Sequence, residues 1–172
     1  IYMVLEYCDK GTLGDLSKLE IRFCIETYRV IAAQIIEALS YLHSNGVVYG
    51  DLKPENVMIN QHGVLKLGDF NLSATSSLLD NKIQGTISYI APELLLQNYR
   101  SEKSDWWALG VLLHYLFYHR FPFKTRNQAE MIVNLFSSSI VDEPSDCKAP
   151  KDFRKFLLAL LEKDPKKRLG DN

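Results

Sequence analysis

The longest apolar run in the chain, WWALGVLLHYLFY at residues 106–118, sets the strongest constraint on the fold. The run is too short for the roughly 20 apolar residues that a membrane-spanning helix needs. A helix that is apolar on all sides is instead typical of a protein core. Ser104 and Asp105 precede the run and offer the side-chain oxygens that begin helices. We therefore predict a buried helix that follows these two residues.

Other periodic segments predict a mainly helical domain. Between about residues 23 and 44, apolar residues recur in steps of three and four, which is the spacing of an amphipathic helix. Residues 127–136 and 151–164 show the same spacing, and residues 10–16 combine a turn with a short polar helix. The buried helix therefore has helical segments on both sides of it in the chain.

A small β element accompanies these helices. IYMVLEY, at residues 1–7, has the β-branched and aromatic composition of a buried strand. VMIN at 57–60 and VLKL at 64–67 flank a Gln-His-Gly turn, which predicts a hairpin. The polar stretch at residues 72–86 is longer than most loops, and loops of that length tend to be functional or disordered.

Composition narrows the class of protein. The 172 residues are 47% hydrophobic, 24% charged and carry a formal net charge of −1. One domain with a sizeable core fits these values, and the charge gives no reason to expect nucleic acid or an acidic membrane as a partner. No membrane segment or signal peptide is expected. Cys8, Cys24 and Cys147 lack metal-ligand spacing, so we expect reduced thiols of an intracellular protein, cytoplasmic or nuclear. No feature indicates an oligomeric state.

Four polar residues around the predicted hairpin suggest a reaction site. Asp51 offers a proton acceptor, Lys53 adds a positive charge two residues away, and Asn56 supplies an oxygen of the type that hard cations prefer. The hairpin folds Asp69 back beside Asn56 and adds a second oxygen. Such a set suits phosphoryl transfer, in which positioning and charge neutralisation supply most of the rate. Each residue taken alone also fits a loop residue that makes local hydrogen bonds.

Several motifs in order resemble the C-terminal lobe of a eukaryotic protein kinase, and the resemblance covers essentially the whole chain. It implies a partial kinase domain over residues 1–172, in which the N-terminal lobe is missing. Residues 1–10 would be the last N-lobe strand and the hinge, 49–56 the catalytic loop and 69–93 the activation segment. DWWALGVL, KKRLG and Tyr49, where most kinases have histidine, are similar to the AGC group of serine/threonine kinases. The motifs are YGDLKPEN (49–56), GDF (68–70), GTISYIAPE (85–93), SDWWALG (104–110) and DPKKRLG (164–170).

The resemblance implies transfer of the γ-phosphate of ATP to a serine or threonine hydroxyl of a protein or peptide substrate. Asp51 would orient the hydroxyl and accept its proton, and Lys53 would hold the γ-phosphate. Asn56 and Asp69 would ligate Mg²⁺. Thr86 would hydrogen-bond near Asp51 and Lys53, which is a trait of serine/threonine kinases.

The resemblance also implies an adenine site at the start of the chain. Leu5 falls at the gatekeeper position, and the backbones of Glu6 and Cys8 at the hinge that meets adenine. Met58 would form the floor under the adenine ring, although the pattern alone also fits a core residue.

Substrate preference is only partly indicated. In kinases that select basic peptides, the residue that matches Glu55 meets an arginine upstream of the acceptor. Thr12 and Tyr115 stand where two cooperating acids usually lie. An ordinary solvated carboxylate at Glu55 therefore remains an equal alternative.

Three further matches imply architecture. Glu93 and Arg168 would form a buried salt bridge. Removal of either partner of such a pair lowers the free energy of unfolding by about 3–5 kcal/mol. Asp105 would cap its helix and hold the backbone of the loop that carries Asp51.

Gly50 departs from the family pattern, because most such kinases have arginine directly before the catalytic aspartate. That arginine grips a phosphate on the activation segment. The usual phosphate acceptor is here Lys82, and a second basic residue is here Ala74. The three changes agree with one another, so we expect that activation-segment phosphorylation is not the switch. The alternative is that Gly50 marks an inactive relative.

Asn71 is a second departure, since it replaces the glycine of the DFG motif. Asparagine tolerates positive φ better than most residues, so Asp69 could still point at a metal ion.

The family's glycine-rich loop, β-strand lysine and paired glutamate precede the hinge and are absent from these residues. We therefore expect the chain alone not to turn over ATP. Two other functions stay open. A pseudokinase scaffold or regulatory binding module is favoured by Gly50, Asn71 and Lys82, and a small-molecule kinase is opposed by the GTISYIAPE segment.

Overall fold

We describe a computed structural model of the chain over residues 2, 4–75, 85–97, 100–123, 130, 133–134 and 147–170. This part is mainly helical with a small β content, as the fold class predicted, and its two antiparallel sheets pair β1 with β4 and β2 with β3. No helix in it is both long and apolar enough to cross a bilayer. The helix predicted at 127–136 falls largely outside the described residues. In chain order the elements are α1 (Leu13–Ser17), α2 (Ile25–Ser44), β1 (Val47–Val48), the 3-10 helix η1 (Pro54–Asn56), β2 (Val57–Ile59), β3 (Leu65–Leu67), η2 (Phe70–Leu72), β4 (Ala74–Thr75), η3 (Ile87–Tyr89), α3 (Pro92–Gln97), α4 (Glu102–Tyr118) and α6 (Lys151–Leu160).

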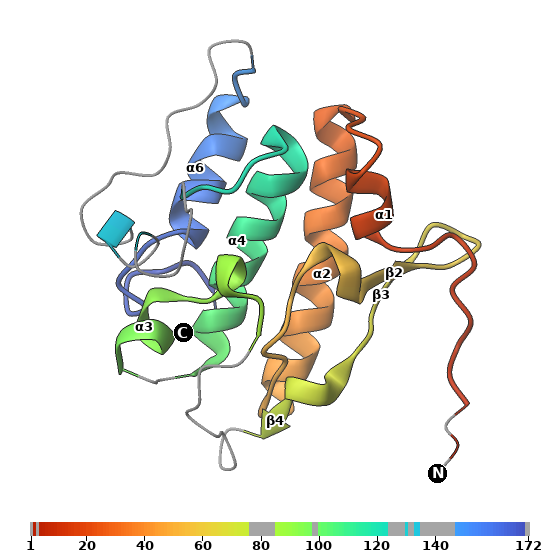
Figure 1. Cartoon of the computed structure of the whole chain (residues 1–172), viewed down its shortest axis with the longest axis horizontal. Coiled ribbons are helices and arrows are strands. Elements are labelled where there is room, and N and C mark those ends of the chain that lie inside the picture. The colour runs from red at the N-terminus through yellow and green to blue at the C-terminus, as the bar shows by residue number, and fades with distance from the viewer. Residues whose placement is uncertain are drawn as a thin grey trace.

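Helix α4 forms the centre of the core and lies between α2 and α6 (Figure 1). Most of its residues from Ser104 to Leu116 are buried, which confirms the prediction of a buried helix. Helix α2 turns its periodic apolar stripe, including Ile35 and Leu39, toward it. A Cβ at Gly110 would lie 2.9 Å from the Cβ of Leu160, so α4 and α6 pack at closest approach there. The hydrophobic effect therefore holds the helices together around α4.

The observed start of α4 differs from the predicted start. The helix begins at Glu102, with Ser101 as N-cap, so the predicted cap at Ser104 and Asp105 is wrong by about one turn. The Ser104 hydroxyl accepts a hydrogen bond from the Ser101 N–H at 3.3 Å. Asp105 does not cap its helix, because its carboxylate binds the backbone of Tyr49 and Gly50.

The predicted strand at residues 1–7 is wrong in its described part. Residues 4–8 belong to neither sheet, and Val4, Leu5 and Tyr7 are 97%, 72% and 84% exposed. The segment extends away from the body of the molecule (Figure 1). Lys10 and Gly11 exchange backbone hydrogen bonds with Ile59, which attach this part of the chain to the hairpin. A strand composition does not produce a strand unless a neighbouring strand can pair with it.

The two sheets frame the segment that carries the polar residues. The β2–β3 hairpin pairs Val57 with Leu67 and Ile59 with Leu65, which confirms the predicted hairpin. The Leu65 N–H donates to the side-chain oxygen of Gln34, so the hairpin is fixed to α2. The β1–β4 pair was not predicted. It joins the residues before Tyr49 to those after Leu72.

Candidate active site

Buried residues fix the loop between β1 and η1. Tyr49 and Leu52 are almost fully buried and anchor the loop on both sides of Asp51. The Asp105 carboxylate accepts the backbone N–H groups of Tyr49 and Gly50, each at 2.8 Å. It also lies 2.9 Å from His43 Nε2 at the end of α2. A buried carboxylate needs such partners, so Asp105 sets the backbone path of the loop.

Asp51, Lys53 and Asn56 form one contact cluster. Lys53 Nζ lies 2.7 Å from Asp51 Oδ2, and Asn56 Nδ2 lies 2.9 Å from the same oxygen. Asn56 Nδ2 also donates to the Asp51 carbonyl at 2.9 Å. The Asp51 side chain is 10% exposed and that of Lys53 22% exposed. A partly desolvated base therefore has a cation and an amide directly beside it.

The hairpin links this cluster to the turn that holds Asp69. The Gly68 N–H donates to the Asn56 carbonyl at 2.9 Å, which places the residue before Asp69 next to Asn56. Since the Asn56 amide nitrogen binds Asp51, its oxygen is the atom left to face a cation. Within the described residues, no three carboxylate, imidazole or thiol groups gather as a metal cage.

Asp69, not Asn71, takes the left-handed backbone conformation. Its φ is 49°, its side chain is exposed, and Oδ1 accepts the Asn71 N–H at 3.4 Å. Asn71 lies within η2, where φ is negative. Asn71 therefore does not use its tolerance of positive φ in this conformation, and the orientation of Asp69 toward a metal ion stays a prediction. Aspartate tolerates that region better than most residues because its short side chain bonds locally.

Tyr49 connects the loop to this turn. Its hydroxyl donates to the Gly68 carbonyl, and its ring meets that of Phe70 edge-on at 5.3 Å. Burial raises the pKa of Tyr49 far above its ordinary value, and the charges of Asp51 and Asp69 raise it further. The hydroxyl therefore stays protonated and remains a donor at neutral pH.

A pocket lies beside Asp51, between the loop and the 85–91 segment. Gly85, Thr86 and Tyr89 line it together with Asp51. Thr86 is exposed at the start of η3. A Cβ at Gly85 would lie 3.4 Å from Asp51 Oδ1, so the segment passes close to the carboxylate.

Glu55 is exposed on η1 beside α1. Thr12 and Tyr115, which replace acids of the family pattern, have structural contacts here. Thr12 caps α1 with Asp15, and Tyr115 stacks on a phenylalanine ring at 4.8 Å. No acidic cluster forms from these three positions.

The residues expected at the adenine site lie on two segments, the stretch before Lys10 and strand β2. Leu5 and Glu6 are exposed and Cys8 is half-buried, on the segment that precedes Lys10. Glu6 lies 3.2 Å from Lys66 on β3, and its hydrogen bond to Lys66 lowers its pKa. Met58 is half-buried on β2, against Gly68.

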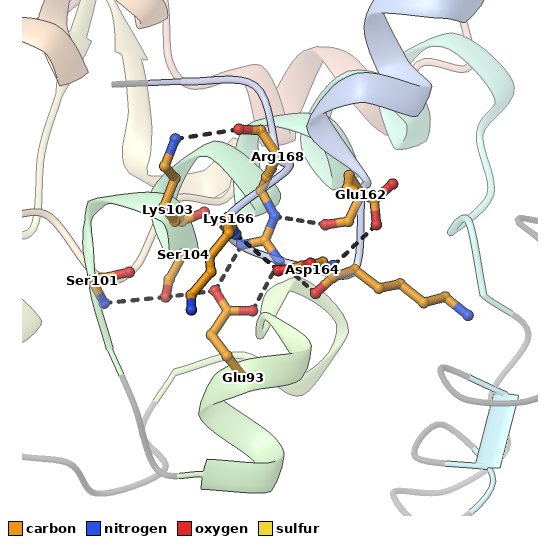
Figure 2. A network of polar contacts seen from close by, with 9 residues as sticks. Glu93, Ser101, Lys103, Ser104, Glu162, Asp164, Lys166 and Arg168 are labelled. Carbon is orange, nitrogen blue, oxygen red and sulfur yellow. Dashed lines mark hydrogen bonds and ion pairs between the residues drawn. The ribbon is translucent and has the colours of Figure 1, made fainter. Parts of the chain in front are cut away.

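Glu93 and Arg168 form a bidentate salt bridge, with bonds of 2.6 and 2.8 Å (Figure 2). Both side chains are almost completely buried. The Ser104 hydroxyl donates to Glu93 at 3.2 Å, and the guanidinium lies 5.1 Å from the ring centre of Trp107. Its remaining bonds go to the carbonyls of Lys103, Glu162 and Lys163. The pair ties α3 to the residues after α6.

Sequence reasoning missed three residues that position the site. His43 contacts Asp105, Ser73 Oγ donates to the Tyr49 carbonyl at 2.8 Å, and Arg100 donates to the Leu72 carbonyl at 3.1 Å. Each acts through a backbone group or a partner far away in sequence, so no local pattern marks it. Lys82, expected to replace the phosphate acceptor, lies outside the described residues, while Ala74 lies in β4.

Comparison with known proteins identifies the family to which the chain is similar. A family model described as the protein kinase domain matches residues 1–171. The serine/threonine-protein kinase Sgk1 of Homo sapiens is 38% identical over 99% of this chain and 39% of its own length. Sgk1 of Danio rerio is 38% identical with the same coverage. The serine/threonine protein kinase ypkA of Aspergillus fumigatus is 36% identical over 100% of this chain and 27% of its own. The chain thus spans about two fifths of the length of the Sgk1 relatives.

Proposed function

The chain belongs to the protein kinase domain family, and from this premise we propose that its parent protein transfers the γ-phosphate of ATP to serine or threonine hydroxyls of proteins. The observation that carries the proposal is the contact cluster of Asp51, Lys53 and Asn56, with bonds of 2.7 and 2.9 Å. A carboxylate, an amine and an amide held this closely match the demands of phosphoryl transfer. The serine/threonine names of the relatives support the choice of hydroxyl.

In this proposal Asp51 orients the substrate hydroxyl and accepts its proton. Its pocket is lined by Thr86, so the substrate enters from the side of the 85–91 segment. Lys53 supplies positive charge beside Asp51 and holds the γ-phosphate near the hydroxyl. The 2.7 Å contact between Lys53 and Asp51 supports a shared role in holding the phosphate beside the proton acceptor.

In this proposal Asn56 and Asp69 would hold Mg²⁺, which would neutralise phosphate charge. The donor set fits, because both residues offer hard oxygen atoms and Asn56 keeps its amide nitrogen on Asp51. The Asn71 N–H uses one acceptor site of Asp69 Oδ1 at 3.4 Å, so the other acceptor sites of the carboxylate would remain for the ion.

We further assign the contact with adenine to Leu5, to the backbones of Glu6 and Cys8, and to Met58. Residues 1–10, 49–56 and 69–93 then serve as hinge, catalytic loop and activation segment of a partial kinase domain. Glu55, which is exposed on η1, is a candidate contact for a basic peptide residue. The exposure of Leu5 and Glu6 leaves both accessible to a ligand.

A regulatory binding module without phosphoryl transfer is the second candidate. The observation that favours it is the Asp69 carboxylate, which binds its own turn through Asn71. In such a module the fold would bind partners or nucleotide while the cluster at Asp51 stays unused.

The deciding experiment measures phosphate transfer from Mg²⁺-ATP to serine and threonine peptides by the full-length protein. We expect Asp51→Asn to lower kcat by about 100- to 10,000-fold, the usual contribution of a general base. Asp152→Asn, an exposed change on α6, should leave kcat unchanged. Nucleotide binding without transfer in the wild type would instead establish the regulatory module.

A further inference from the structure

Gly50, directly before Asp51, leaves space that another side chain uses. Its φ is +83°, a left-handed conformation that glycine adopts without strain. A Cβ at this position would lie 3.0 Å from Arg100 Nη1 and 3.0 Å from the Leu72 carbonyl oxygen. The guanidinium of Arg100 therefore occupies the place where a side chain at residue 50 would begin.

Arg100 reaches this place from the connection between α3 and α4. The residue is 4% exposed, and Nη1 donates to the Leu72 carbonyl at 3.1 Å. It lines the same pocket as Asp51 and Asp105. Because a guanidinium stays charged even when buried, this position holds a permanent positive charge next to the catalytic loop.

The segment that follows Asp69 has three attachments to the catalytic loop region. The β1–β4 pair joins Val48 to Ala74, and the Ser73 hydroxyl donates to the Tyr49 carbonyl. The third attachment is the bond from Arg100 to Leu72, which is the one among these three that involves a charged group. All three use groups of the chain itself.

We propose that Arg100 is a positioning residue that fixes residues 69–75 against the catalytic loop without any phosphate on the activation segment. Gly50 supplies the space, and the Leu72 carbonyl replaces an added phosphate as the acceptor. A backbone carbonyl is always present, so this attachment is permanent where a phosphate contact would be reversible. The effect of this attachment on catalysis rests on the proposed kinase function, whereas the contact between Arg100 and Leu72 does not depend on that function.

The test uses full-length protein treated with a phosphatase and shown by mass spectrometry to carry no phosphate on residues 73–88. We expect this form to keep at least half of the untreated kcat. Arg100→Met should lower kcat by tenfold or more. Arg100→Lys keeps the charge, and its kcat should lie between those of the wild type and Arg100→Met. Arg29→Met, an exposed change on α2, is the matched control and should change kcat less than twofold.

Hydrogen exchange separates positioning from general destabilisation. In Arg100→Met, amides of residues 47–50 and 72–75 should exchange at least tenfold faster, while those in the middle of α2 and α4 stay unchanged. Equal acceleration in all these elements, or none, would overturn the proposal, as would loss of activity on dephosphorylation. If the wild type transfers no phosphate in any state, the proposed function fails, and the exchange pattern alone decides whether the attachment exists.

Discussion

Arg168 illustrates how single residues keep a charge inside this protein. Arginine has five N–H donors, and the guanidinium of Arg168 makes two bonds to Glu93 and further bonds to three backbone carbonyls. Charge-assisted bidentate pairs are among the strongest hydrogen bonds in proteins. Removal of one partner therefore leaves the other charge buried and uncompensated.

We expect Arg168→Met to lower the free energy of unfolding by about 3–5 kcal/mol, because Glu93 would keep only the Ser104 hydroxyl as a side-chain donor among the contacts described. Urea titration followed by circular dichroism measures the change. Lys155→Met, an exposed change on α6, should stay within about 0.5 kcal/mol. A loss below about 1 kcal/mol in Arg168→Met would show that the pair behaves like a surface ion pair.

Tyr49 gives a pH-dependent prediction. Burial raises its pKa in the folded state above the ordinary 10.0. Above that pH the unfolded state binds fewer protons than the folded state, so stability falls as pH rises. The stability that depends on the protonated Tyr49 hydroxyl is fully present below pH 10.0, and it is lost as pH rises toward the higher folded-state pKa.

Tyr49→Phe should remove part of this dependence and lower stability at neutral pH by about 0.5–1.5 kcal/mol, since Gly68 loses its donor. Urea unfolding from about pH 8 to about pH 11 measures both effects. Burial also raises the pKa of Tyr28 and Tyr89, so part of the slope should remain. Tyr41→Phe, at a residue 70% exposed, should leave the slope unchanged.

Among the elements, those with a long periodic pattern were predictable from the sequence. Helix α2 follows its apolar spacing and helix α4 follows its continuous apolar run, although α4 begins about one turn earlier than predicted, with Ser101 as N-cap. Strands β1 and β4 have two residues each and carry no period to detect. The segment at 4–8 has the composition of a strand but no pairing strand in the described part of the chain.

The residues of the candidate site also divide into those that local spacing predicts and those that it does not. Asp51, Lys53 and Asn56 lie within a few residues of one another, so their spacing alone predicted the cluster. Arg100 acts on a carbonyl 28 residues away, and His43 on a carboxylate 62 residues away. Such contacts depend on how complete elements pack, which local spacing does not encode.

At the contact between α4 and α6, helix propensity and packing have opposite effects on the stability of a Gly110 variant. Helix propensity alone predicts that Gly110→Ala stabilises the protein by about 1 kcal/mol. The added Cβ would, however, lie 2.9 Å from Leu160 Cβ and 3.0 Å from the side chain of Leu161. Since overpacking costs about 1–3 kcal/mol, we expect a net loss of stability in urea unfolding. A gain in stability would show that α6 can move away from α4 at little cost.

At the scale of the whole molecule, nucleotide binding should be linked to stability. We expect Mg²⁺-ATP to raise the melting temperature of the full-length protein, because a ligand at 100 times its Kd stabilises by about 2.7 kcal/mol. Asp69→Asn should greatly reduce the part of the shift that requires Mg²⁺. Asp152→Asn is the control and should keep the full shift. An identical shift in Asp69→Asn would place the metal ion elsewhere.

The buried carboxylate of Asp105 links the shape of the loop to the packing of two helices during folding. It receives N–H groups from the catalytic loop and contacts His43 at the end of α2, while its own backbone belongs to α4. The loop is therefore shaped only after two helices that are distant in the chain have met. Partially folded forms in which α2 and α4 have not yet packed together should therefore lack this loop geometry.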